Sequence, residues 1–141
     1  MMGILGVAML LSLQGAAGGA QAKPSGGAAE VVGTWEGESK CTVPDSPCKD
    51  EHVIYEIAED EKAPGRLTMK ADKVVNGERQ YMGTLNCEYH ADKKNLSCSG
   101  QTRHKDDWEY TISGDTMTGT LKIGEEKTLY RKISVKKKSG H

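Results

Sequence analysis

Short runs of alternating apolar and polar residues fill the chain from about residue 31 onward, and turn-forming residues separate the runs. In the run 51–59, Val53, Tyr55 and Ile57 share one side of an extended chain, because side chains in a strand point alternately to opposite faces. The same period of two continues in the later runs. The pattern predicts strands at about 31–42, 51–59, 66–75, 78–90, 95–101, 107–113, 116–123 and 128–136.

The segments between these runs favour tight turns, and Asn76-Gly77 is the strongest hairpin signal among them. Eight short strands at nearly even spacing predict an all-β fold, an eight-stranded antiparallel up-and-down barrel. Closure removes unpaired sheet edges, and a barrel of this size is filled by side chains or holds one small ligand. A sandwich of two sheets is the alternative.

The first 22 residues have the features of a secretory signal peptide. Ile4 to Leu13 is an apolar stretch too short to span a bilayer, and Ala20-Gln21-Ala22 is a small-x-small cleavage site. No basic residue precedes the apolar stretch, and a buried helix of the mature domain is the alternative. We expect a signal peptide at 1–22, a flexible Pro- and Gly-rich linker at 23–29, the barrel domain at 30–137 and a disordered tail at 138–141.

All four cysteines follow the signal peptide, and an even number in an exported chain favours disulfides. Three connectivities are possible. Cys41 and Cys48 flank a short loop that contains Pro44 and Pro47, so a bridge there closes a local loop. Cys87 lies opposite Cys98 if the intervening turn has four residues, 91–94. We prefer these two pairs, and the expected location of the protein is secreted or periplasmic.

Arg131 is an unusual residue, because it lies among Leu129, Ile133 and Val135 on the face expected to be buried. A buried guanidinium needs a charged or aromatic partner. In a closed barrel the last strand pairs with the first, which carries Trp35. We therefore expect Arg131 to stack on Trp35 as a structural pair at the barrel end.

Gly33-Thr34-Trp35 in the first strand and Leu129-Tyr130-Arg131-Lys132 in the last resemble the calycin superfamily, chiefly the lipocalins. The resemblance implies a tryptophan and a late basic residue packed at the closed end, and a ligand held inside. The Thr-Asp-Tyr-like run of that family and its C-terminal helix are not evident in this short chain.

Two neighbouring barrel families are also similar. Gly33 to Gly37 resembles the opening of nitrobindin-type haem barrels, but the last strand has no histidine to ligate iron. The Thr118-Gly119-Thr120-Leu121 run is similar to avidin-type barrels, whose ligand-binding set has no residue-by-residue match here. We expect neither haem nor biotin, and no cofactor.

Catalytic and metal-binding motifs are not found. The sequence has no Gly-x-Ser-x-Gly elbow, phosphate loop or His-Glu-x-x-His, and its cysteine spacings do not match a zinc site. The formal net charge of −1 gives no footprint for nucleic acid. We therefore expect a protein that is not an enzyme, holds no metal and has no nucleic-acid partner.

Aromatic and other large residues on the faces expected to point inward are candidates for lining a ligand pocket, and the alternative is that they fill the barrel. They are Tyr55, Met69, Tyr81, Leu85, Tyr89, Trp108, Tyr110 and Met117. The favoured function is an exported lipocalin-like barrel that binds a small apolar or amphipathic molecule. The alternative is a filled barrel that acts as a protein-interaction module, an inhibitor or an envelope accessory factor, for an unidentified protein partner. An enzyme is the third possibility.

Overall fold

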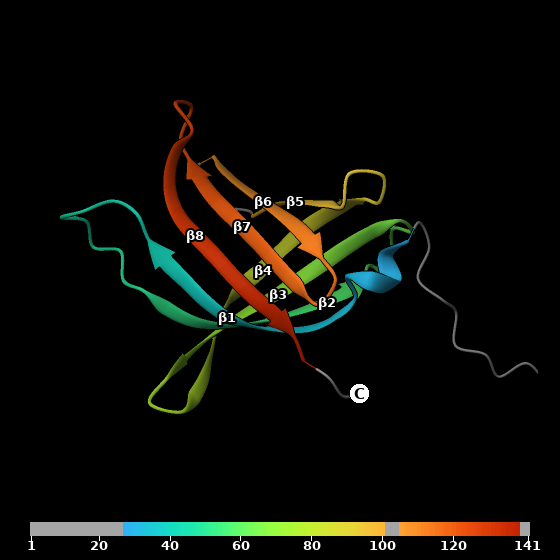
Figure 1. Ribbon diagram of the computed structural model, residues 1–141, viewed down its shortest axis with the longest axis horizontal. Coiled ribbons are helices and arrows are strands. Elements are labelled where there is room, and N and C mark those ends of the chain that lie inside the picture. The colour runs from blue at the N-terminus through green and yellow to red at the C-terminus, as the bar shows by residue number, and fades with distance from the viewer. Residues whose placement is uncertain (1–26, 101–104, 139–141) are drawn as a thin grey trace, which may run out of the picture.

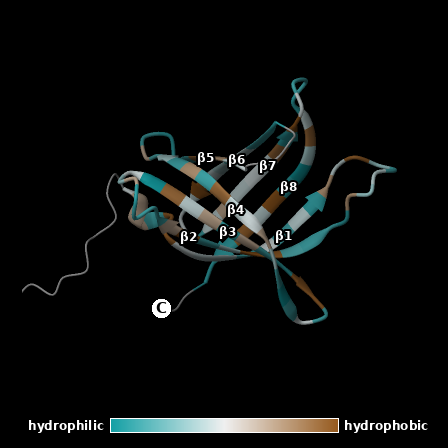
Figure 2. Ribbon diagram, turned by 180° about the vertical axis from the view of Figure 1, so that it is seen from behind, coloured by the Kyte–Doolittle hydropathy of each residue, from teal (hydrophilic) through white to brown (hydrophobic). Residues whose placement is uncertain are grey.

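The computed structural model describes residues 27–100 and 105–138, which form a closed antiparallel barrel of eight strands (Figure 1). This confirms the predicted fold class. The strands are β1 (Gly33–Cys41), β2 (Glu51–Glu59), β3 (Arg66–Val75), β4 (Glu78–His90), β5 (Asn95–Ser99), β6 (Asp106–Ser113), β7 (Thr116–Ile123) and β8 (Thr128–Lys137). Apolar and polar residues alternate along them (Figure 2). The predicted signal peptide at 1–22 lies outside the described residues. Among the residues that are described, no helix is long and apolar enough to cross a bilayer.

Each strand pairs with the next in the chain, and β1 also pairs with β8, which closes the barrel. The β3–β4 connection shows why the sequence favours this order. Asn76 and Gly77 have φ angles of 53° and 80°, and both central residues of a type I′ hairpin turn need positive φ. Asparagine and glycine are the residues that adopt this conformation at least cost.

Both expected disulfides are present, Cys41–Cys48 and Cys87–Cys98. The β4–β5 turn has four residues, so His90 pairs with Asn95 and Cys87 lies opposite Cys98 at a Cα–Cα distance of 4.1 Å. Two disulfides, with no free cysteine, are typical of chains that fold in an oxidising compartment.

One half of the barrel is filled around Trp35, which is fully buried. Its indole Nε1 donates a hydrogen bond of 2.8 Å to the carbonyl oxygen of Val31. A short 3₁₀ turn, η1 (Ala28–Glu30), precedes Val31, and Ala28 packs in the core. Ala28 lies within the segment 23–29 that was expected to be a linker, and its side chain contributes to the core. At the other terminus, the Lys138 amide donates to the Thr34 carbonyl, so Lys138 belongs to the barrel rather than to the tail.

The expected stacking of Arg131 on Trp35 is wrong. In the β1–β8 register Trp35 lies opposite Lys137, and Arg131 lies opposite Cys41 at the other end of the two strands. Lys137 places its Nζ 5.6 Å from the Trp35 ring centroid and so takes the cation–π position. The strand order was predictable, but the offset with which β8 closes on β1 was not.

The end of the β3–β4 hairpin extends beyond the barrel as an arm, residues 75–82, seen at the bottom of Figure 1, whereas β3 pairs with β2 as far as Val74. A β-bulge lies at its base, where Gly83 pairs with Ala71 and Tyr81 with Asp72, which leaves Met82 as the extra residue. The bulge breaks the strict alternation of faces. Tyr81, which was expected to point inward, is therefore 62% exposed.

Candidate ligand-binding cavity

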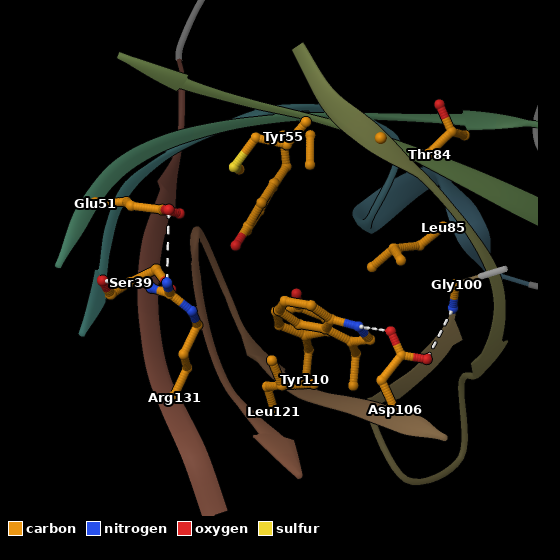
Figure 3. Close-up of a pocket in the computed structure, with 14 residues that line it drawn as sticks. Ser39, Glu51, Tyr55, Thr84, Leu85, Gly100, Asp106, Tyr110, Leu121 and Arg131 are labelled. Carbon is orange, nitrogen blue, oxygen red and sulfur yellow. Dashed lines mark hydrogen bonds and ion pairs between the residues drawn. The ribbon is translucent and has the colours of Figure 1, made fainter. Parts of the chain in front are cut away.

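The other half of the barrel contains a cavity of about 410 Å³ (Figure 3). Its volume lies in the range of small-molecule sites. Half of its fourteen lining residues have apolar or aromatic side chains: Tyr55, Ala71, Met82, Leu85, Trp108, Tyr110 and Leu121. The ionisable or hydroxylic side chains outside this aromatic set are Ser39, Glu51, Thr84, Asp106 and Arg131. The cavity therefore combines an apolar wall with a small polar group, which suits an amphipathic molecule.

Tyr55 and Tyr110 separate the filled half of the barrel from the cavity. Their rings meet edge to face with centroids 6.1 Å apart, and both residues are buried. Gly119 lies opposite Tyr110 on β7, and a Cβ atom at this position would collide with the Tyr110 ring. The absence of a side chain at Gly119 thus creates the space that the ring occupies.

The two phenols remain protonated at neutral pH. Burial raises the pKa of Tyr55 to about 12 and raises that of Tyr110 well above its usual range. The Tyr55 phenol also raises the pKa of Tyr110, whose hydroxyl oxygen is buried and has no hydrogen-bond partner of good geometry among the described residues. Because this oxygen has almost no accessible surface, Tyr110 lines the cavity with its ring and not with its hydroxyl.

Arg131 lies at the polar side of the cavity, where β8, β1 and β2 are neighbours. Its Nη1 donates to Ser39 Oγ at 3.2 Å and to the Ser39 carbonyl at 3.4 Å, and its Nη2 is 3.5 Å from Glu51 Oε1. Its side chain is only 12% exposed. These contacts are long for charge-assisted hydrogen bonds, and they leave guanidinium donors free for another acceptor.

Trp108 and Asp106 stand at the opposite side of the cavity. The Trp108 Nε1 donates to Asp106 Oδ2 at 3.1 Å, and the other Asp106 oxygen accepts from the Gly100 amide at 3.4 Å (Figure 3). β5 ends at Ser99, so residues 78–85 of β4 pair only with β3 among the described residues. Within residues 27–100 and 105–138, no strand pairs with this part of β4 on its side toward β6.

Four of the eight predicted pocket residues line the cavity: Tyr55, Leu85, Trp108 and Tyr110. Met69 and Met117 point inward but are fully buried in the filled half, so they contribute to the core instead. Tyr89 packs against that core with its hydroxyl buried, and Tyr81 points outward. The sequence thus mostly predicted which side chains point into the barrel. Which of these side chains line the cavity depends on their position along the barrel axis, which the sequence pattern did not predict.

Sequence reasoning missed several lining residues, although the period of two contained a signal for some. Ser39 is four residues after Trp35 in one strand, and Glu51 is four before Tyr55, so each shares the face of its aromatic neighbour. Asp106 has the same relation to Trp108, two residues away. Met82 had no such signal, because only the bulge turns it toward the cavity.

A second polar cluster lies on the outer face of the barrel. His52 Nδ1 is 2.9 Å from Glu38 Oε1, and His52 Nε2 is 3.0 Å from Glu36 Oε2. These hydrogen bonds raise the pKa of His52 and lower that of Glu36.

No three His, Cys, Asp or Glu side chains within residues 27–100 and 105–138 are arranged to hold a metal ion. No protein-family model and no curated protein matches this chain.

Proposed function

We propose that this protein is an exported, lipocalin-like carrier that binds a small amphipathic molecule in the cavity. The observation that carries the proposal is a cavity of about 410 Å³ that combines an aromatic wall with the Arg131 guanidinium. In a barrel that served only as a scaffold, side chains that filled this space would increase stability, since voids cost packing energy. The closed eight-stranded barrel and the Gly33-Thr34-Trp35 opening support the lipocalin-like class.

Export to the periplasm or the cell exterior is part of the same proposal. The apolar stretch and small-x-small site in residues 1–22 support it, and so do the two disulfides. A carrier outside the cytoplasm meets apolar compounds in water, where their transfer into an aromatic cavity is favourable.

The test is native mass spectrometry of the mature protein, purified from its own host without reductant. A discrete small-molecule adduct is the expected result, and it should disappear in Leu85→Arg, which places a long charged side chain in the cavity. Lys132→Glu is the matched control, because Lys132 is exposed on the outer face of β8. An adduct retained in Leu85→Arg would contradict binding in the cavity, and a bare chain that also takes up no amphipathic probe would contradict the carrier function.

A protein-interaction role is the second candidate, and the β3–β4 arm is the observation that favours it. Among the described residues, the exposed large hydrophobic side chains are Val75, Tyr81 and Met82, all on or at the base of this arm. The arm projects from the barrel, and one edge of β4 is unpaired within the described chain. Exposed apolar side chains beside an unpaired strand edge are typical of protein-docking sites.

Photo-crosslinking from position 81 tests this role in the native host. The expected result is one adduct of defined mass that is reduced by Val75→Ser and is not formed from position 132 on the opposite outer surface. Equal crosslinking from both positions, or none, would exclude the arm as a specific docking element.

A further inference from the structure

The chemistry of the cavity identifies the class of head group that it would hold, an inference that rests on the proposed carrier function. Two groups on its walls can donate hydrogen bonds: the Arg131 guanidinium, which has N–H groups beyond those that contact Ser39 and Glu51 among the described residues, and the hydroxyl of Tyr55. Figure 3 shows the Tyr55 hydroxyl pointing from β2 into the space between Arg131 and Tyr110. Such an arrangement of donors calls for an acceptor.

The acidic residues of the lining do not compete strongly for these donors. Asp106 already accepts from the Trp108 indole and the Gly100 amide at the opposite side. Glu51 is the direct counter-ion of Arg131, but their closest approach is 3.5 Å, longer than a strong charge-assisted bond. A guanidinium can bind one carboxylate at each of two edges, so Glu51 and a ligand can both contact Arg131.

We propose that the cavity selects molecules that join an apolar body to a carboxylate, and that Arg131 binds this carboxylate together with the hydroxyl of Tyr55. The apolar body lies against Leu85, Met82 and Trp108 on the other side of the cavity.

Three probes with the same ten-carbon chain test the proposal: decanoate, 1-decanol and decylamine. Each is titrated into the oxidised protein near neutral pH, by calorimetry or by the change in tryptophan fluorescence. The expected result is that decanoate binds about tenfold more tightly than 1-decanol, the gain of a charge-assisted hydrogen bond to a buried guanidinium. Decylamine is expected to bind least.

Two substitutions that each remove one positive charge test whether Arg131 is the source of the preference for decanoate. Arg131→Gln is expected to remove the preference for decanoate, whereas Lys132→Gln, which changes the neighbouring residue on the outer face, is expected to keep it. Glu51→Gln removes the competing carboxylate and should tighten decanoate binding several-fold. Tyr55→Phe deletes only the hydroxyl that points into the cavity, so it should weaken decanoate binding.

The outcomes separate this inference from the carrier function on which it rests. Equal affinity for decanoate and 1-decanol, or tightest binding of decylamine, would overturn the carboxylate proposal while leaving an amphipathic carrier. Binding of none of the three probes would overturn both. If Arg131→Gln fails to fold, Glu51→Gln and Tyr55→Phe test the inference, and unchanged decanoate affinity in both would contradict the inferred head-group site.

Discussion

Trp35 is the residue whose removal should cost the fold most. Its side chain is fully buried and its indole N–H is satisfied by Val31. We expect Trp35→Ala to lower the free energy of unfolding by about 3–5 kcal/mol, since it leaves a large void in a packed region. Trp108→Ala is the matched control, because Trp108 is only half-buried beside an existing cavity and should cost less. Chemical denaturation measures both, and equal losses would contradict the division into filled and hollow halves.

His52 gives the stability of the barrel a pH dependence. Its raised pKa comes from hydrogen bonds to Glu38 and Glu36, so its contribution is full below the unfolded value of 6.5 and is lost as the pH rises through the raised folded value. The pKa of Glu36 is lowered by His52, with Lys138 also nearby, so its contribution is full above 4.5 and is lost in acid below that. The cluster therefore stabilises most between pH 4.5 and 6.5.

Melting temperatures of the native protein and His52→Gln check this dependence. We expect the difference between them to be larger at about pH 5.5 than at about pH 8.5, because the stabilising contribution of His52 is lost as the pH rises. His90→Gln serves as the control, because His90 is exposed at the end of β4. A difference that grows with pH would show that the imidazolium does not stabilise the fold.

The disulfides act on different elements, and their removal should have unequal effects. Cys41–Cys48 closes the β1–β2 connection, whose cysteines are half-buried, whereas Cys87 and Cys98 are buried partners in the short β4–β5 pairing. Loop-closure entropy alone gives each about 2–3 kcal/mol, since their sequence separations are similar. We expect the Cys87→Ala/Cys98→Ala pair to cost more, because it also leaves a void. Denaturation of both double variants measures the order, and a larger loss for Cys41→Ala/Cys48→Ala would contradict it.

Individual strands and turns were predictable because their signals are local. Asn76-Gly77 specifies its own turn, and the four-residue loop after His90 brings Cys87 opposite Cys98. The bulge at Met82 was not predictable, because it depends on how β4 meets β3 where both leave the barrel. A single extra residue reverses every facing assignment beyond it, which is why Tyr81 was misplaced and Met82 was overlooked.

At the scale of the whole molecule, the register in which β8 pairs with β1 determines contacts that local sequence patterns do not predict. The offset between β1 and β8 separates Trp35 from Arg131 and assigns them to opposite halves. Lys137 lies over the Trp35 ring in the filled half, whereas Arg131 contacts Ser39 and Glu51 at the cavity. The same eight strands thus build a packed support and a hollow site, and no single strand contains the information that sets their boundary.

This division predicts opposite responses to one kind of substitution. Ala71 lines the cavity between Tyr55 and Gly83, so Ala71→Leu should fill empty space, raise stability by about 1 kcal/mol and abolish probe binding. Val135 is fully buried in the filled half, where Val135→Leu should instead cost about 1–3 kcal/mol through overpacking. Thermal unfolding and decanoate titration of both variants measure the contrast. Because a space kept empty at the expense of stability indicates selection for a ligand, destabilisation by Ala71→Leu would remove the main physical reason for assigning this barrel a cargo.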